Sequence, residues 1–437
     1  MNKNEKVVVF GLGYVGLPLS LSFAFRGSDV IGVDVSEDLV NDINKGITYH
    51  TEKFEDITIQ EVLAKQLKKN SFKAVVDVKS IPKDYNNFIV TVGIPVNGGV
   101  QNYDYLKSCS ESLGSILKKG DTVIIRSTVI PGTTEDFILP ILEKTSGLKA
   151  GEDFHLAYSS ERIAEGRAFE EFAFMPTVVG AINNQSLERA AKVLSIVCKT
   201  DIIKASNIKV VETSKVFENV QRDVNIAMSQ EFARFTEKLG IDIYEVIKIA
   251  NTHKRVNLLT PGPGVGGYCI PNAYYYLEPK AKEMGVDLDI LKLSRNKNEA
   301  LPELIVNILE EELKKVGKDI KGKKIGVLGI AMKDYSNDDR ISPPISIINI
   351  LLERGANVCA FDPIVPTSYD FKYDNADDVI KDADAILVLA KQKEIENIDA
   401  NFVIDNIQKD GIVFDTRNLF TANKSDFAQK GIKYLSL

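Results

Sequence analysis

The sequence predicts an α/β protein with two doubly wound domains, which are joined by a long central helix and a small helical domain. The first observation is an apolar, β-branched run near the N-terminus that leads through a glycine-rich turn into a helical pattern. The second is a similar alternation of strands and helices over residues 320–437. Between the two, one helical stretch runs from about residue 210 to 239. We therefore expect domains at residues 1–205, 206–305 and 320–437.

Composition and charge limit the classes of protein to which the chain can belong. Its 437 residues exceed the size of one hydrophobic core, and 44% hydrophobic with 26% charged residues is typical of a globular protein. No apolar run approaches roughly 18 residues and no signal peptide is evident, so we expect no membrane span and a cytoplasmic location. The net charge of −7 argues against nucleic acid as a partner. Four cysteines and three histidines show no disulfide or ligand spacing, so no metal is expected.

The glycine-rich turn near the N-terminus has the pattern of a dinucleotide-binding site. It reads G-L-G-Y-V-G, in which Gly11 makes the tight turn, Gly13 lets the backbone approach a pyrophosphate and Gly16 permits close packing of the helix. Asp34 lies 18 residues after Gly16, where a carboxylate binds ribose hydroxyls. No arginine follows it to bind a 2′-phosphate, so the predicted cofactor is NAD. The predicted cofactor contacts here are Gly11, Gly13, Tyr14, Val15, Gly16 and Asp34.

The stretch T-P-G-P-G-V-G-G-Y-C-I-P, residues 260–271, places Cys269 in a shaped loop. Its four glycines permit positive φ and close approach of a ligand, and its three prolines stiffen the rest. A thiol held beside exposed N–H groups is presented as a nucleophile. The alternative is a buried thiol in a turn-rich connection.

These segments resemble the nucleotide-sugar 6-dehydrogenases of the UDP-glucose/GDP-mannose dehydrogenase family. The cysteine loop carries the resemblance, together with E-x-x-K-x-x-x-N at residues 212–219 and R-x-x-N-x-x-x-P at residues 295–302. R-D-V-N-I-A at residues 222–227 and H-K-R-V-N at residues 253–257 are similar to the branch that acts on UDP-N-acetylhexosamines, UDP-N-acetylmannosamine above all. The resemblance covers nearly the whole chain. It implies two Rossmann-like domains, a UDP-sugar substrate bound by the second, and a homodimer or higher homo-oligomer.

The resemblance also implies roles for single residues. Cys269 captures the C6 aldehyde as a thiohemiacetal, which is oxidised to a thioester. Lys215 favours the thiolate and, with Asn219, stabilises the oxyanion, while Glu161 in S-S-E-R serves hydrolysis. Thr128 in S-T-V lies near the cofactor. The implied substrate contacts are Arg222, Arg255, Gly266, Lys333, Arg340 and Arg417.

From the residues alone, several of these assignments have simpler alternatives. Thr128 could lie in an ordinary capped turn between a strand and a helix, and the basic residues Lys333, Arg340 and Arg417 could be surface charges. Glu161 could be a solvated carboxylate in a loop. Lys215, Asn219 and Arg222 follow at i, i+4 and i+7, which is also the pattern of a solvated helix face.

The chain departs from the family pattern at several positions. Ala273 replaces an aspartate four residues after the cysteine, and Tyr268 replaces a histidine or serine just before it. Arg126 stands where a glutamate is usual, and Ser160 where a proline is common. Without the carboxylate, deprotonation could be slower, Asn272 with a bound water could substitute, or the substrate or reaction could differ.

The predicted function is the NAD-dependent, four-electron oxidation of a UDP-N-acetylhexosamine at C6 to the uronate, with UDP-N-acetylmannosamine as the best candidate. The product would be a precursor of surface polysaccharide or glycan. UDP-N-acetylglucosamine or UDP-glucose is the alternative substrate. The alternative classes are a two-electron hydroxyacid dehydrogenase and a non-catalytic nucleotide-sugar-binding relative, the latter because of Ala273. The number of NADH molecules formed per sugar separates these classes. A four-electron dehydrogenase gives two, a two-electron dehydrogenase gives one, and a binding protein gives none.

Overall fold

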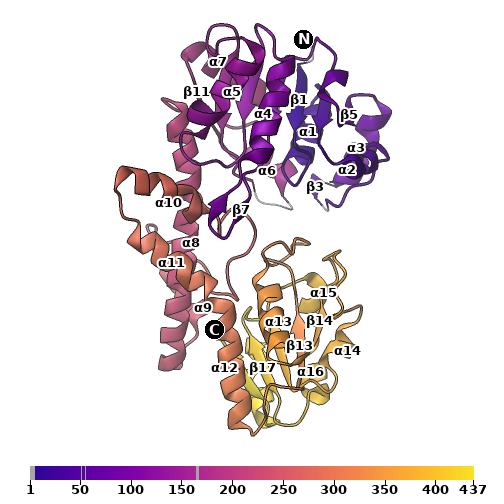
Figure 1. The fold of residues 1–437 in the computed structure, drawn as a ribbon. Helices are drawn as coiled ribbons and strands as arrows, with labels where there is room; N and C mark the ends of the chain where they lie inside the picture. Colours follow the sequence, from indigo (N-terminus) through magenta and orange to yellow (C-terminus); the bar gives the residue numbers. More distant parts are fainter. Residues whose placement is uncertain (1–4, 51, 55, 164–166) are drawn as a thin grey trace. The chain divides into compact units, whose positions relative to one another are not determined.

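The computed structural model describes residues 5–50, 52–54, 56–163 and 167–437 (Figure 1). They form two compact units. The first comprises Met1–Glu218 and Tyr275–Val286, and the second comprises Asn219–Tyr274 and Asp287–Leu437. Helices α8 (Ile208–Leu239) and α10 (Ala273–Met284) contribute residues to both.

The first unit is built on one sheet of eight strands. The strands are β1 (Lys6–Phe10), β2 (Asp29–Val33), β5 (Phe72–Val75), β6 (Asn87–Val90), β9 (Thr122–Ile125), β10 (His155–Ser159), β11 (Thr177–Ala181) and β12 (Ile202–Lys204). Their order is β12-β11-β10-β9-β6-β1-β2-β5, and all neighbours are parallel except β10 and β11. The chain starts at β1, moves to one edge and then crosses to β6 on the other side of β1. The carboxyl ends of β1 and β6 therefore form the switch point at which doubly wound sheets bind ligands.

Helices and two small hairpins complete the first unit. The helices are α1 (Gly16–Phe25), α2 (Glu37–Asn44), α3 (Ile59–Lys68), α4 (Asp104–Ile116), α5 (Leu139–Ser146), α6 (Ala168–Phe174) and α7 (Asn184–Leu194), with a short 3-10 helix η1 (Val78–Ser80) and a short π-helix η2 (Thr134–Ile138). The hairpins are β3 (Lys53–Phe54) with β4 (Ile57–Thr58), and β7 (Val96–Asn97) with β8 (Val100–Gln101). Central strands such as β1 and β9 are continuous apolar runs because side chains on both sheet faces are buried.

The second unit contains a parallel sheet of six strands and several helices. The strands are β13 (Lys324–Leu328), β14 (Asn357–Phe361), β15 (Lys372–Tyr373), β16 (Ala385–Val388), β17 (Ile412–Asp415) and β18 (Lys433–Ser436). The other elements are α9 (Ile243–Ala250), α11 (Asp289–Glu299), α12 (Leu301–Lys315), α13 (Pro343–Glu353), α14 (Ala376–Ile380), α15 (Lys393–Glu396), α16 (Ala400–Asn406), η3 (Thr421–Asn423) and α17 (Lys424–Gln429). The strand order β15-β14-β13-β16-β17-β18 repeats the doubly wound order of the first sheet.

The predicted fold class is confirmed, since both sheets have the Rossmann-like order and α8 is the long helix expected from about residue 210. The apolar run near the N-terminus corresponds to β1, and the alternation over residues 320–437 corresponds to the second sheet and its helices. The sequence reading missed β5, β11 and β12, which lie toward the edges of the first sheet. Edge strands are short and partly exposed, so they lack a continuous apolar run. Among the described residues, no helix is both long and apolar enough to cross a membrane.

Candidate active site

The glycine turn between β1 and α1 has the geometry of a phosphate-binding turn. Gly11 has φ +87°, which favours glycine, and Gly16 packs so closely that a Cβ there would lie 1.7 Å from the Gly11 carbonyl oxygen. A Cβ on Gly13 would meet no atom within 4 Å, so the backbone there is open to a ligand. The first turn of α1 carries no acidic side chain and offers its N–H groups to an anion. These residues fit the pyrophosphate of a dinucleotide.

Asp34, at the carboxyl end of β2, is held beside this turn. Its Oδ2 accepts a hydrogen bond from Leu12 N at 2.8 Å, and its Oδ1 accepts one from Ser36 N at 3.0 Å. The side chain is only partly buried, so acceptor positions are left for ribose hydroxyls. Tyr14 and Val15 are half-buried in the same turn, and the Tyr14 ring lies 5.0 Å from that of Tyr49.

Thr128 follows β9, the next strand beyond β6, and is half-buried. The segment before it is fixed, because Arg126 N donates to Val90 O at 2.8 Å and Ser127 Oγ donates to the same oxygen at 3.3 Å. Thr128 therefore lies at the carboxyl edge of the sheet, where the ligands of such sheets bind.

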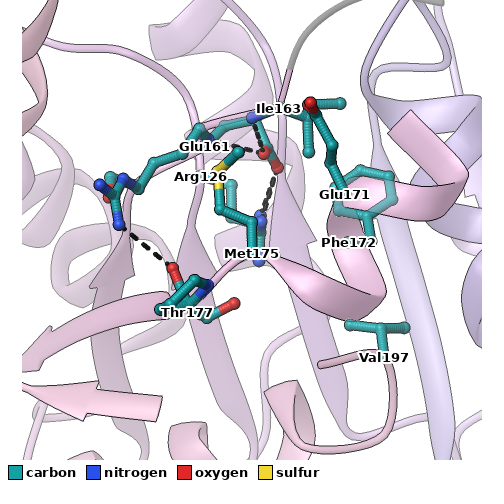
Figure 2. A pocket seen from close by; sticks show the side chains of 11 residues that line it. Arg126, Glu161, Ile163, Glu171, Phe172, Met175, Thr177 and Val197 are labelled. Atoms are coloured by element: carbon teal, nitrogen blue, oxygen red, sulfur yellow. Dashed lines mark hydrogen bonds and ion pairs between the residues drawn. The ribbon is translucent and has the colours of Figure 1, made fainter. Parts of the chain in front are cut away.

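Glu161, two residues after β10, is buried and fully hydrogen-bonded (Figure 2). Its Oε2 accepts from Arg126 Nε at 3.0 Å and Nη2 at 2.6 Å. Its Oε1 accepts from Arg162 N at 2.7 Å and Ile163 N at 3.0 Å. The residue is 8% exposed, so the alternative of a solvated loop carboxylate is wrong. Glu165 and Gly166, which follow in the sequence, lie outside the described residues.

Lys215, Asn219 and Arg222 on α8 differ in burial. Lys215 and Asn219 are buried, which excludes a solvated face for these two, whereas Arg222 is exposed. The buried side of the helix continues from Asn219 to Asp223, four residues further on, and leaves Arg222 outside it. Within the second unit, Asn219 Nδ2 donates to the Cys269 carbonyl oxygen at 3.5 Å.

Glu212, one turn before Lys215, is a buried carboxylate that the sequence reading did not single out. It accepts from Gly132 N at 2.6 Å and Thr134 N at 2.9 Å, and so ties α8 to the turn that follows Thr128. Burial raises the pKa of its carboxyl above the usual value, against the opposing effect of these hydrogen bonds. The E-x-x-K spacing was the signal that could have identified it.

The cysteine loop exposes Cys269 while packing its glycines tightly. A Cβ on Gly266 would lie 2.8 Å from Met332 Cβ and 2.8 Å from Pro343 Cδ, and the Gly262 carbonyl accepts from Gln230 Nε2 at 2.9 Å. Gly266 therefore serves close packing within the second unit, in addition to any role toward a substrate. An exposed thiol on a fixed loop is the arrangement expected of a nucleophile, so the buried-thiol alternative is wrong.

The residues around Cys269 at which the chain departs from the family pattern differ in burial. Ala273 is fully buried at the first residue of α10, and Asn272 before it is 5% exposed. Tyr268 is exposed and lies under the Arg340 guanidinium, with 5.3 Å between the ring centroid and Cζ. Arg340 and Tyr268 thus connect the loop to the second sheet's domain.

The basic residues predicted to bind the nucleotide lie after β13 and β17. Arg340 Nη2 pairs with Asp338 Oδ2 at 2.6 Å, Arg417 pairs with Asp334, and Lys333 is exposed. Both arginines are therefore held in position by carboxylates of the same unit. Arg255 is exposed, in the segment after α9.

The second sheet's first turn differs from the glycine turn of the first. Asp362, after β14, accepts from Ile330 N and Ala331 N through Oδ2, and from Ile364 N and Val365 N through Oδ1. It is 1% exposed, so unlike Asp34 it has no room for a ribose hydroxyl. The arrangement of Asp34 beside the glycine turn is therefore not repeated in the second sheet.

Comparison with known proteins accounts for both domains. The UDP-glucose/GDP-mannose dehydrogenase family matches with its NAD binding domain at residues 5–198, its central domain at residues 209–300 and its UDP binding domain at residues 326–422. The chain belongs to this family. It is therefore an NAD-dependent nucleotide-sugar dehydrogenase, its cofactor is NAD and its substrate is a UDP-sugar.

Relatives of known structure or activity are similar over nearly their full length. A UDP-N-acetyl-D-mannosamine dehydrogenase of Pyrococcus horikoshii is 33% identical over 427 residues, which is 98% of this chain and 99% of the relative. Protein CapL of Staphylococcus aureus is 34% identical over 434 residues, covering 98% and 99% of the two chains. A solved UDP-D-ManNAc dehydrogenase from P. horikoshii superposes with a TM-score of 0.89 at 31% identity, covering 99% of this chain and 98% of that one.

Proposed function

We propose that this family member oxidises C6 of UDP-N-acetylmannosamine to the uronate through a covalent intermediate on Cys269. The observation that carries the substrate is the full-length similarity to relatives named UDP-N-acetyl-D-mannosamine dehydrogenase. The observation that supports the covalent step is an exposed thiol on a rigid loop. The product would be a precursor of surface polysaccharide or glycan.

We propose that cofactor binding and substrate binding are assigned to different domains of the family. We place these domains at residues 1–205, 206–305 and 320–437. The glycine turn and Asp34 would hold NAD, which when bound accepts the hydride that leaves C6 in each of the two oxidations. Thr128 would lie near it. Lys333, Arg340 and Arg417 would bind the UDP part, since arginine and lysine suit phosphate oxygens.

The chain's own residues would perform the remaining steps. The Cys269 thiolate adds to the aldehyde carbon, and the resulting C–S bond persists when the thiohemiacetal is oxidised to a thioester. Water then forms the new C–O bond, the C–S bond breaks, and the sulfur takes up a proton. Lys215 and Asn219 would stabilise the negative oxygen of the tetrahedral states, and Glu161 would serve the hydrolysis. Arg222, Arg255 and Gly266 would contribute to substrate binding.

A homodimer or higher homo-oligomer is part of the proposal. Met228, Phe232, Phe235 and Leu239 on α8 follow at intervals of four, three and four residues and are 38% to 66% exposed. We call these four side chains the apolar stripe of α8. Apolar side chains at alternating intervals of three and four residues form the contact surface between paired helices. We propose that the partner of this stripe is a second copy of the chain.

The deciding experiment is a panel of UDP-sugars read by NADH absorbance. UDP-N-acetylmannosamine should give two NADH per sugar, and more rapidly than UDP-N-acetylglucosamine, UDP-N-acetylgalactosamine or UDP-glucose. One NADH per sugar would indicate a two-electron dehydrogenase. Binding of the sugars without any NADH would indicate a binding protein.

The covalent step is tested by Cys269→Ser in the same assay. A hydroxyl is a far weaker nucleophile at neutral pH and cannot carry a thioester, so uronate formation should fall by at least about three orders of magnitude. Cys198→Ser, in a buried cysteine remote in sequence, is the control and should retain activity. Full uronate production by Cys269→Ser would exclude the covalent mechanism.

A further inference from the structure

Within the second unit, four polar side chains of α8 are buried and contact the backbone of a single segment. Each of the four residues is at most 7% exposed, and they are Asn219, Asn225, Ser229 and Gln230. A buried polar side chain is costly unless it is hydrogen-bonded. The backbone atoms that these four bind lie between residues 257 and 269, a segment that ends at the proposed nucleophile.

Asn225 and Ser229 bind the start of this segment. Asn225 Nδ2 donates to Asn257 O at 2.6 Å, and Asn225 Oδ1 accepts from Leu259 N at 3.3 Å. The Ser229 hydroxyl lies close enough to donate to Leu259 O. The chain therefore enters the cysteine loop, residues 260–271, from a fixed position.

Gln230 binds the cysteine loop itself. Its Nε2 donates to Gly262 O at 2.9 Å, and both residues are buried. Its other amide atom, Oε1, is buried and has no partner in the part of the chain that the structure describes. Residues 260–267 belong to neither a helix nor a strand, so Gln230 supplies a hydrogen bond that secondary structure does not provide.

Arg417, which follows β17, contacts the same two residues of the loop. Its Nη1 donates to Pro261 O at 3.4 Å, and a Cβ on Gly262 would collide with this nitrogen. Its Nε donates to Asp334 Oδ1 at 3.0 Å. Residues 261 and 262 are therefore held both by α8 and by the second sheet's domain.

Close packing connects Gly262 to the thiol. A Cβ on Gly264 would lie 2.7 Å from Pro343 Cβ, and one on Gly266 would lie 2.8 Å from Pro343 Cδ. Closely packed segments have low compressibility and transmit displacement. A shift of Gly262 would therefore move Cys269 instead of being absorbed within the loop.

We propose that Gln230 is a positioning residue for Cys269. Its hydrogen bond to Gly262 O fixes the start of the cysteine loop, and the packed loop then fixes the place at which the thiol is exposed. The inference deepens the proposed function, on which it rests for the role of Cys269 as the nucleophile that captures the aldehyde.

The test variant is Gln230→Met, examined first by hydrogen exchange and mass spectrometry. Methionine is similar in length but cannot donate to Gly262 O. It also removes the buried Oε1 that lacks a partner among the described residues, so the cost in stability should be small. The amides of residues 260–271 should exchange at least about tenfold faster, because the loop opens more readily. Peptides from the second sheet should exchange as before.

The same variant should be slowed at one chemical step. In a single turnover with UDP-N-acetylmannosamine, the first NADH should appear at the normal rate, because this hydride leaves C6 before the thiol adds. The second NADH should appear about tenfold more slowly, because a misplaced thiol captures the aldehyde less often. The affinity for UDP, measured by calorimetric titration, should be unchanged, because Arg417 keeps its ion pair with Asp334.

Gln392→Met is the matched control. Gln392 is a buried glutamine of the same unit, and its Nε2 donates to another backbone carbonyl, Ser336 O, at 2.9 Å. Its Nε2 also lies 3.4 Å from both carboxylate oxygens of Asp362, so this variant should lower the melting temperature at least as much as Gln230→Met. Neither the exchange of residues 260–271 nor the ratio of the two NADH rates should change.

Three results would overturn the positioning role. They are unchanged exchange of the loop in Gln230→Met, faster exchange with a normal second NADH, and equal slowing of the second NADH by Gln230→Met and Gln392→Met. A different result would count against the proposed function instead. If acid-quenched samples of the unmodified protein show no adduct on Cys269 with any UDP-sugar, the covalent mechanism fails, and the exchange experiment still decides whether Gln230 fixes the loop.

Discussion

At the scale of single residues, two side chains that the family pattern assigns to chemistry are also held by the protein's own backbone and charges. Glu161 is bound by four N–H groups, and the Asn219 amide donates to the backbone of the Cys269 loop. Both residues thus fix the segments that carry the reacting groups. The sharpest remaining difference from the family is Ala273, which follows the loop and is fully buried.

We predict that Ala273→Asp raises the turnover number about a hundredfold, at the lower end of what a positioned base contributes. The new carboxylate would stand at the first residue of α10, where the helix N-terminus favours negative charge. Because the site is buried, the variant should also be less stable, which thermal unfolding would measure. Ala273→Asn, similar in size but uncharged, is the matched control. Equal turnover of the two variants would show that the position has no catalytic role in this chain.

At the scale of elements, α8 joins the two units and carries residues with different tasks along its length. Glu212 binds the turn after Thr128 in the first unit. Asp223 in the second unit forms a buried ion pair with Arg295, at 2.9 Å between Nη1 and Oδ1, and accepts from Asn298 Nδ2 at 2.8 Å. Glu212 and Asp223 make these contacts on buried parts of the helix surface. The side chains of the apolar stripe make none of them and are exposed.

Disrupting the apolar stripe should separate the proposed oligomer. Phe235→Asp places a charge in the middle of the stripe, and we expect at least about a hundredfold weaker self-association, which light scattering after size-exclusion chromatography would detect. Arg234→Asp introduces the same side chain at an exposed neighbouring position outside the stripe and should leave the assembly intact. A monomeric unmodified protein at micromolar concentration would refute the proposed assembly.

At the scale of the whole molecule, one buried histidine predicts how stability depends on pH. His50 stacks on Tyr49 with ring centroids 4.5 Å apart, and burial lowers its pKa from 6.5 to about 4. The Glu52 carboxylate, 4.0 Å from Nδ1, is the nearby charge. Because the unfolded chain binds the proton more readily, stability is fully present above pH 6.5 and is lost as the pH falls toward 4.

Replacing His50 by phenylalanine should remove this part of the acid sensitivity. Between pH 7 and pH 4.5 the free energy of unfolding of the unmodified protein should fall by roughly 2–3 kcal/mol more than that of His50→Phe. Urea unfolding at the two pH values measures the difference. The control is His253→Gln, which replaces an exposed histidine. Its free energy of unfolding should fall between the two pH values by as much as that of the unmodified protein. A pH dependence that is the same in all three proteins would contradict the neutral, buried state of His50.

The sequence by itself determined the fold class, NAD as the cofactor and membership of the family, because these depend on local patterns. Apolar runs mark central strands, the spacing of Gly11, Gly13 and Gly16 shapes one turn, and Asp34 ends the next strand. The tertiary structure decided the partners of each side chain. Arg126 and Glu161 lie 35 residues apart, and they meet only because β9 and β10 are neighbours in the sheet. Burial and pairing are properties of such long-range contacts, which local patterns do not encode.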